Sequence, residues 1–164
     1  MAKNKEEKTN VMRVLEQKKI AYTAHTYPHE EGVAVDGVTV AKSMGFDPAI
    51  VFKTLVARGA SKQYYVFDVP VAENLDLKKA AKAVGEKSIE MIHQKELLPL
   101  TGYVHGGCSP VGMKKLFPTV FHETAENLAA MIVSAGKIGY QVETAPQALI
   151  ALVRAGTAEL TIES

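Results

Sequence analysis

The feature that most restricts the fold is a glycine-rich stretch at residues 103–112, which reads Tyr-Val-His-Gly-Gly-Cys-Ser-Pro-Val-Gly. Three glycines and a proline in so short a stretch predict a loop. Gly106 and Gly107 lack a Cβ, so their backbone can approach a ligand or take positive φ. Pro110 directs Ser109 toward an extended conformation. Such a loop can point successive N–H groups at one oxyanion or phosphate; the alternative interpretation is a tight turn between two strands.

The length of 164 residues and the 47% apolar content predict one domain over 1–164 with a sizeable core. Residues 1–8 are polar, with no apolar segment after them, so we expect a frayed end rather than a secretory signal. No apolar run approaches the length that spans a bilayer, so we expect no membrane association. Cys108 is the only cysteine, which excludes an internal disulfide and makes a cytoplasmic location the expectation.

The net charge of +1 excludes the basic excess with which proteins bind long nucleic acids by their phosphates, while contact with a short piece remains open. The glycine pair is not followed by Gly-Lys-Ser/Thr, so neither a P-loop nor a dinucleotide motif is present. The five histidines do not lie at metal-ligand spacing from Cys108. We therefore expect no metal ion and no cofactor.

Helical spacing of apolar residues and capping residues at the segment ends predict five helices. The first helix begins at Thr9 or Asn10, the second covers 38–44 and ends at Gly45, and the third runs from Asn74 or Asp76 to Gly85. The fourth covers 93–98 and ends near Pro99, and the fifth runs from Thr144 to Gly156. Strands are predicted over 21–27, 50–57, 63–70, 119–122, 131–134, 138–142 and 158–162. Because two successive pairs of these strands read as hairpins, we expect an α/β (α+β) fold with a mixed, largely antiparallel sheet and surrounding helices.

Lys53 interrupts the otherwise apolar, β-branched run at 50–57. A lysine in such a strand is costly unless it faces a cleft or a partner. The functional interpretation is an ammonium held by rigid backbone at the floor of a pocket, and the alternative is a snorkelling edge residue. Ser134 ends a second apolar run just before a glycine turn, where either a ligand-binding hydroxyl or a plain turn residue is common.

Cys108 and His105 lie three residues apart, which raises the question of a nucleophile and its base. No Asp or Asn nearby is placed to orient the histidine, and both residues share one glycine loop. A small apolar filler is therefore the interpretation that we favour for Cys108.

Several motifs together resemble the YbaK aminoacyl-tRNA deacylases, free-standing relatives of the editing domain of bacterial prolyl-tRNA synthetases. The resemblance runs from about Asn10 to the end of the chain and rests on His25-Thr26-Tyr27, Phe52-Lys53-Thr54-Leu55, Asp76-Leu77-Lys78-Lys79, Thr101-Gly102-Tyr103, the stretch from Gly106 to Gly112, and Val133-Ser134-Ala135-Gly136-Lys137. It implies a single editing domain whose barrel-like sheet is surrounded by helices.

The resemblance also implies site residues. The predicted catalytic residues are Lys53, Gly106, Gly107 and Ser109, and the predicted substrate-binding residues are Tyr27, Thr54, Cys108, Pro110, Ser134 and Gly136. Gln141 stands where the family pattern has an aspartate, and 30–37 matches the pattern poorly. These departures bear on the amino-acid preference more than on the reaction class.

The implied activity is hydrolytic removal of cysteine wrongly attached to proline tRNA, extending to Cys-tRNA(Cys). An aminoacyl ester is already activated, so placement and charge stabilisation matter more than a strong base. We expect N–H groups at 106–109 to hold the developing oxyanion, and Lys53 to pair with the terminal adenosine phosphate or the same oxygen. The thiol of a cysteinyl ester can attack its own carbonyl, which would explain why no Ser–His or Cys–His pair is evident.

The implied partners are the 3′ acceptor end of an aminoacyl-tRNA and prolyl-tRNA synthetase, with the protein itself a monomer or a weak homo-oligomer. Two other functions remain open: a deacylase for another residue, such as alanine, with water as nucleophile, and a non-catalytic module that binds tRNA or a synthetase. We further expect Gly106 to tolerate no side chain, because a Cβ there would occupy the space where the ester carbonyl approaches.

Overall fold

The computed structural model describes residues 8–162, so the end expected to fray, 1–8, lies outside the described residues except for its last member. Five α-helices occur in this part of the chain: α1 (Asn10–Gln17), α2 (Gly37–Met44), α3 (Leu77–Val84), α4 (Gln94–Thr101) and α5 (Pro146–Val153). Its strands are β1 (Thr23–Thr26), β2 (Phe52–Gly59), β3 (Tyr64–Pro70), β4 (Ile89–Met91), β5 (Thr119–His122), β6 (Met131–Lys137), β7 (Tyr140–Thr144) and β8 (Gly156–Ala158). Two 3-10 turns, η1 (Pro48–Ile50) and η2 (Glu123–Asn127), complete the order.

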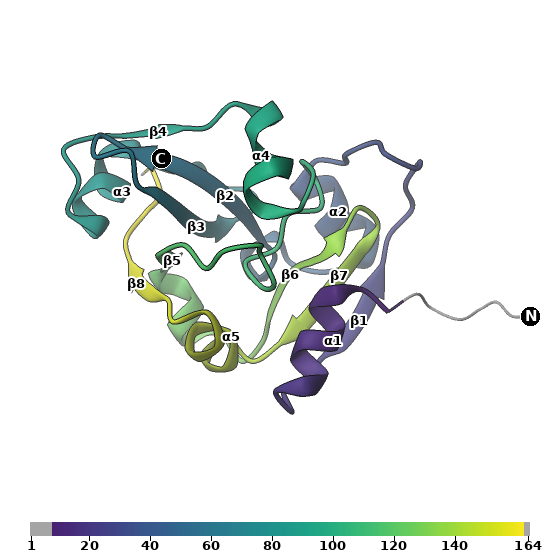
Figure 1. Ribbon diagram of the computed structural model, residues 1–164. Helices are drawn as coiled ribbons and strands as arrows, with labels where there is room; N and C mark the ends of the chain where they lie inside the picture. Colours follow the sequence, from purple (N-terminus) through teal and green to yellow (C-terminus); the bar gives the residue numbers. More distant parts are fainter. Residues whose placement is uncertain (1–7, 163–164) are drawn as a thin grey trace, which may run out of the picture.

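The strands form two sheets that lie next to each other (Figure 1). The smaller sheet has the order β1-β7-β6 and is antiparallel throughout. The larger sheet has the order β4-β2-β3-β5-β8, antiparallel between β4, β2 and β3 and parallel from β3 through β5 to β8. Both predicted hairpins, β2–β3 and β6–β7, are confirmed.

A parallel bridge between Val51 and Ile132 joins the two sheets at the beginning of β2. Both side chains are buried, with exposed fractions of 1% and 0%. The mixed α/β fold is confirmed, but "barrel-like" describes it loosely, because the edge strands of the two sheets in the described part of the chain do not close on one another. The seam between the sheets is where the functional site forms.

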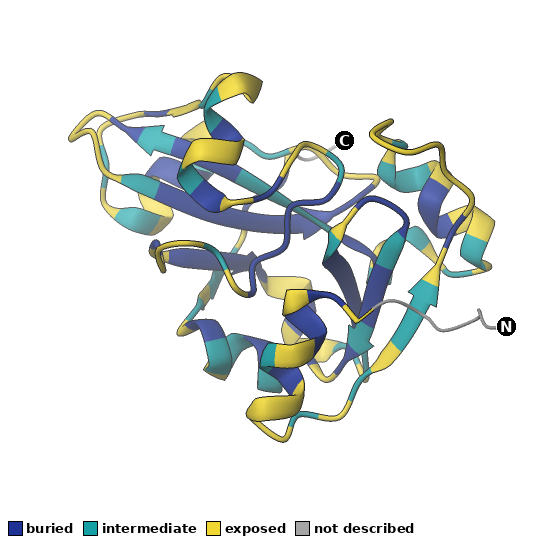
Figure 2. Cartoon of the chain, turned by 45° about the vertical axis from the view of Figure 1, so that its right-hand side comes forward, coloured by how far each residue is buried: buried dark blue, intermediate teal, exposed yellow. Residues whose placement is uncertain are grey.

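Helices α1, α2 and α3 have ends at the residues that capping chemistry predicts. Thr9 caps α1 by accepting a hydrogen bond from the Met12 N–H, and Asp76 caps α3 through the N–H groups of Lys78 and Lys79. Gly45 ends α2 in the left-handed conformation. Buried strands lie between helices whose outer faces are exposed (Figure 2).

Four details differ from the predictions. Strand β4 was not predicted, because three residues are too few to show a periodic pattern. Helix α4 passes Pro99 and ends at Thr101, whose hydroxyl donates to the Leu97 carbonyl. Thr144 does not cap α5, because it belongs to β7 and its hydroxyl donates to the Ala21 carbonyl.

The fourth difference concerns the end of the chain. Arg154, at φ 57°, ends α5 in the left-handed conformation, so the helix ends before Gly156. Gly156 begins β8, and the predicted strand over 158–162 is reduced to a bridge between Thr161 and Leu75. Within residues 8–162, no helix has the length and apolar character that crossing a bilayer requires.

Candidate active site

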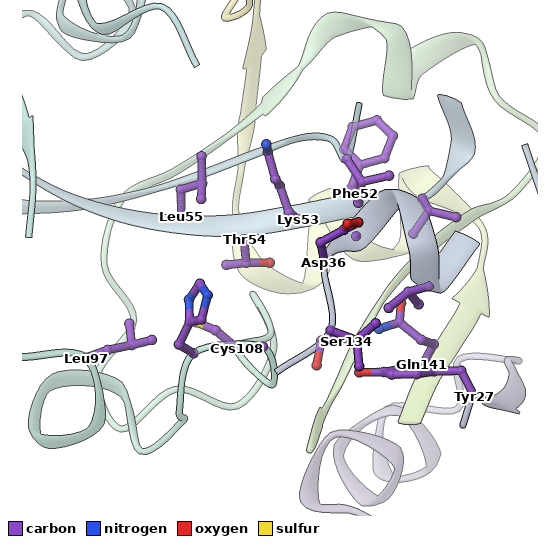
Figure 3. Close-up of a pocket in the computed structure, with 17 residues that line it drawn as sticks. Tyr27, Asp36, Phe52, Lys53, Thr54, Leu55, Leu97, Cys108, Ser134 and Gln141 are labelled. Carbon is purple, nitrogen blue, oxygen red and sulfur yellow. The ribbon is translucent and has the colours of Figure 1, made fainter. Parts of the chain in front are cut away.

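A cavity of about 300 Å³ lies at the seam between the two sheets. One wall is the first half of β2, the second is the β6–β7 hairpin, and the glycine loop at 103–112 supplies the third. The N-terminus of α2, from Val35 to Gly37, forms the rim. Figure 3 shows side chains from all of these segments facing one space. Of the predicted site residues, Tyr27, Lys53, Thr54, Gly106, Cys108 and Ser134 line it.

One end of the cavity is polar and is built by the smaller sheet. Ser134 on β6 and Gln141 on β7 are direct partners in the antiparallel register, and Tyr27 follows β1 (Figure 3). The Tyr27 hydroxyl and the Gln141 Oε1 are buried and have no hydrogen-bond partner among the described residues. Since buried polar atoms are nearly always paired, these two atoms mark a place where a ligand would supply the partner. Gln141, where the family resemblance led us to expect an aspartate, lines the cavity.

The glycine loop contributes backbone N–H groups. Those of Gly106, Cys108 and Ser109 have no hydrogen-bond acceptor within residues 8–162, and Gly106 and Cys108 line the cavity. The Gly107 N–H, in contrast, donates to the Val104 carbonyl at 2.9 Å. The expected oxyanion site at 106–109 thus lacks the Gly107 amide in this structure, because a turn within the loop uses it.

Gly106 has φ +90°, and a Cβ built on it would lie 2.7 Å from the Cβ of Ala34. The structure adds a cause to the one predicted, since the Cβ would meet the neighbouring segment whether or not a substrate is bound. Gly107 has ordinary φ, but a Cβ there would lie 3.0 Å from the Ile138 N. Both glycines let the loop pack closely against its surroundings.

Four predicted residues lie outside the cavity lining: Gly107, Ser109, Pro110 and Gly136. Ser109 is fully buried, and its hydroxyl oxygen accepts a hydrogen bond from the Val111 N–H at 3.2 Å. Gly136 has φ +93°, and a Cβ there would lie 3.0 Å from the Tyr103 ring. Its N–H donates to the Ser134 hydroxyl at 3.0 Å. These residues hold the loop and the hairpin in place around the site.

Lys53 and Thr54 extend from opposite faces of β2, as the alternation of a regular strand predicts (Figure 3). Lys53 is partly buried, and this burial lowers the pKa of its ammonium, while the charge of Glu73 acts in the opposite direction. Within the described residues its ammonium forms no ion pair. Lys53 therefore keeps a charge available at the rim of the cavity, on the side away from Cys108.

Asp68 was not among the predicted site residues, yet it fixes the position of Thr54. The Thr54 hydroxyl donates to the Asp68 Oδ1 at 2.5 Å. Asp68 is fully buried, and its Oδ2 has no partner in the described part of the chain. Burial raises the pKa of this carboxyl to about 8, although the Thr54 hydrogen bond lowers it. The signal was present in the sequence: an acidic residue interrupts the apolar run at 63–70, just as Lys53 interrupts the neighbouring strand.

Cys108 is buried, and its thiol is not an activated nucleophile. Burial, followed by the charge of Asp68, raises the pKa of the thiol to about 12. A thiol with that pKa stays protonated at neutral pH and reacts slowly. Across residues 8–162, no group of three or more His, Cys, Asp or Glu side chains could hold a metal ion.

The small cavity has free backbone amides and buried unpaired polar atoms, and the described residues offer no activated side-chain nucleophile. Such a site is typical of an enzyme that acts on an acyl group that is already activated.

The comparisons with known proteins agree with this class. The profile of the aminoacyl-tRNA editing domain matches residues 32–152, and the chain belongs to this family. It is 46% identical over 162 residues to an Enterococcus faecalis (strain ATCC 700802 / V583) protein named "Putative Cys-tRNA(Pro)/Cys-tRNA(Cys) deacylase EbsC", with 98% of each chain covered. The resemblance to YbaK deacylases seen in the motifs is thereby confirmed at the level of the family.

Two solved structures share the fold. One, described as "a putative trans-editing enzyme for prolyl tRNA synthetase", superimposes with a TM-score of 0.79 at 25% identity, covering 93% of this chain and 95% of that chain. The other, described as hypothetical protein APE2540, gives a TM-score of 0.81 at 18% identity, with 93% and 99% covered. This second likeness concerns the fold alone.

Proposed function

We propose that this protein is a trans-editing deacylase that cleaves the ester of Cys-tRNA(Pro), and also of Cys-tRNA(Cys), with all of 1–164 forming one editing domain. The observation that carries the proposal is the cavity of about 300 Å³, which combines free amides of the glycine loop with two unpaired buried polar atoms. The name of the Enterococcus relative, which matches over the whole length of the chain, supports the choice of substrate.

The geometry supports a simple division of roles. The free N–H groups of Gly106 and Cys108 stabilise the oxyanion that forms as the ester carbonyl is attacked, an effect worth about 10²–10³ in rate for one donor. The Tyr27 hydroxyl and the Gln141 carbonyl bind the polar groups of the aminoacyl moiety. Lys53 extends from the face of β2 away from Cys108 (Figure 3), so of its two predicted partners we propose the phosphate of the terminal adenosine rather than the oxyanion at the glycine loop.

The nucleophile is the thiol of the cysteinyl ester itself. The buried, protonated Cys108 offers no alternative within the site. This route also supplies discrimination, because one methylene in an apolar pocket provides only about 1–3 kcal/mol, whereas an alanyl ester lacks the nucleophile altogether.

The test is deacylation of a panel of substrates: Cys-tRNA(Pro), Cys-tRNA(Cys), Ser-tRNA(Pro), Ala-tRNA(Pro) and Pro-tRNA(Pro). We expect rapid cleavage of the two cysteinyl esters and little cleavage of the seryl ester, which has the same shape but a poor nucleophile. Preferred cleavage of the alanyl ester would replace the proposal by a water-dependent deacylase. Binding without cleavage of any ester would favour a non-catalytic tRNA module.

We also propose that tRNA selectivity comes from prolyl-tRNA synthetase, which would present the 3′ acceptor end to the cavity. The structural relative described as a trans-editing enzyme for prolyl tRNA synthetase supports this partner, and the net charge of +1 leaves the protein few phosphate contacts of its own. Deacylation at limiting enzyme, measured with and without the synthetase, should show a faster rate when the synthetase is present. The protein itself we expect to be a monomer or a weak homo-oligomer.

A further inference from the structure

Beneath the cavity lies a polar pair that the roles above do not use. Asp68 on β3 and Thr54 on β2 are direct partners in the antiparallel register, and the Thr54 hydroxyl donates to the Asp68 Oδ1 at 2.5 Å. Asp68 has no exposed surface, while Thr54 lines the cavity. In Figure 3, Thr54 extends to the same side of β2 as Cys108 and Ser134. The pair thus connects a fully buried carboxyl to the space where a substrate would lie.

A carboxyl at this position is unfavourable for the fold alone. The neighbours of Asp68 along β3 are the buried Phe67 and Val69, and its partner on β5 is the buried Phe121. Its Oδ2 lacks any hydrogen-bond partner among residues 8–162. Burying an acidic group with an unpaired oxygen costs stability, and a branched apolar residue would suit the strand better. A role in the reaction accounts for what packing does not explain.

We propose that Asp68 is a positioning residue that accepts, through the Thr54 hydroxyl, the proton lost by the nucleophile when it attacks the ester. The inference rests on the proposed deacylase function. The thiol proton passes to the Thr54 Oγ1 as the Thr54 proton passes to the Asp68 carboxylate. The sulfur then forms a bond to the carbonyl carbon.

The tetrahedral intermediate collapses when the bond between that carbon and the ribose oxygen breaks. The same pair returns the proton to the leaving oxygen, so that Asp68 ends as a carboxylate. The products are the free tRNA and a cyclic thioester of cysteine. With water as nucleophile the proton follows the same path, and the product is the free amino acid.

The surroundings of Asp68 suit this role. Thr54 and Phe121, its partners on the two adjacent strands, carry no charge, and Cys108 of the glycine loop is the titratable group that interacts with it electrostatically in the described part of the chain. Burial raises the pKa of Asp68 to about 8, close to the ordinary pKa of a thiol at about 8.5. A base is most effective when its pKa lies near the working pH.

The decisive variant is Asp68→Asn, which keeps the shape and an oxygen that can accept the Thr54 hydrogen bond but cannot take up a proton. The substrate is the aminoacyl-tRNA that the wild-type protein cleaves fastest in the panel, and kcat/KM is measured from about pH 6 to pH 9 after subtraction of spontaneous hydrolysis. We expect a loss of about 10²-fold below pH 7. The loss should shrink steadily above pH 8, where thiolate or hydroxide forms without a base.

Asp76→Asn is the matched control, because it removes the same charge at a helix cap where asparagine is equally good, and it should behave as wild type at every pH. Thr54→Ser keeps the hydroxyl and should retain most activity, whereas Thr54→Val should repeat the pH-dependent loss. The Thr54→Val variant also carries the test if Asp68→Asn fails to fold, as judged by circular dichroism. If the double variant loses no more activity than either single variant does, the two residues act as one unit.

A ratio of wild-type to Asp68→Asn activity that is the same at every pH would overturn the inference, because a merely structural role predicts a constant factor. Unchanged activity in Asp68→Asn or Thr54→Val would do the same. These results leave the deacylase function intact. Wild-type protein that cleaves no ester of the panel rejects both the function and the inference.

Discussion

Glycine is required at position 106 for two reasons, the positive φ and the lack of space for a Cβ, and experiments can distinguish them. Gly106 has φ +90°, and a Cβ would lie 2.7 Å from the Cβ of Ala34. We predict that Gly106→Ala lowers the free energy of unfolding by more than about 1 kcal/mol, which is the cost of positive φ alone, and that deacylation falls as the loop shifts. Chemical denaturation and steady-state kinetics measure the two effects.

Gly45 provides the matched control, because it has φ +80° and open space around its missing Cβ. Gly45→Ala should cost only the backbone term and leave deacylation unchanged. If Gly106→Ala were no more destabilising than Gly45→Ala, the close packing against Ala34 would be irrelevant to the loop.

Lys53 carries a charge that its partly buried position disfavours. Burial lowers the pKa of its ammonium, so the lysine does not stabilise β2. We predict that Lys53→Ala leaves the melting temperature equal or higher and lowers kcat/KM by about 10²-fold, as expected when a charged contact to a phosphate, worth up to about 3 kcal/mol, is lost. Lys78→Ala, on the exposed face of α3, is the control. Near-wild-type turnover in Lys53→Ala would remove it from the site.

Cys108 should be dispensable for chemistry. Its buried thiol, with a pKa of about 12, remains protonated in the working range of the protein. We predict that Cys108→Ser retains most of the activity and that iodoacetamide leaves the native wild-type protein unmodified at pH 8. A folded but inactive Cys108→Ser would require a thiol nucleophile of the enzyme itself.

At the scale of the elements, the β2–β3 pair makes stability depend on pH. The pKa of Asp68 is raised by burial to about 8, so the folded state binds a proton more tightly than the unfolded state does. Stability from this group is therefore greatest at low pH and is lost as the pH rises from about 4 to about 8.

It follows that Asp68→Asn should stabilise the protein more at pH 9 than at pH 5. We expect the difference to grow by about 1 kcal/mol or more, since each unit of pKa shift corresponds to about 1.4 kcal/mol. Urea denaturation at the two pH values measures it. An equal effect of the substitution at both would show that Asp68 ionises as freely in the folded protein as in the unfolded one.

Local patterns in the sequence predicted the elements, and the reason is physical. The caps of α1 and α3 and the two hairpins depend on neighbours a few residues away, and these interactions are visible in a single chain. The parallel pairing of β3 with β5 and the division into two sheets depend on residues about fifty apart, which leave no periodic signal. Helix α4 passes Pro99, a residue type that usually ends a helix, so the local signal placed the end of α4 too early.

The residues of the candidate site, too, could be predicted only where the sequence carries a local signal. Lys53 and the glycine loop were conspicuous in their own segments, and both border the cavity. Their roles came from a family resemblance rather than from the residues alone. Gly107 and Gly136 could not be separated from Gly106 in the sequence, because only the fold shows which amide is free and which glycine packs beneath a ring.

At the scale of the whole molecule, the charge predicts weak and salt-tolerant binding to tRNA. A net charge of +1 leaves few phosphate contacts, and each contact adds about 0.9 to the log–log salt slope on duplex. We predict a shallow slope for the isolated protein when affinity for tRNA(Pro) is measured by fluorescence anisotropy across a salt series. A steep slope with tight binding would show that the protein selects its tRNA without a synthetase.

The position of the cavity at the seam between the sheets also governs when activity can arise during synthesis. Strand β7 joins the sheet only after residue 144 has been translated, and β7 brings Gln141 next to β1 and β6. A chain emerging from the ribosome therefore carries Lys53 and the glycine loop for a long time before it has an enclosed site. We therefore expect incomplete chains to leave the surrounding aminoacyl-tRNAs intact, with deacylation beginning only once β7 has been made.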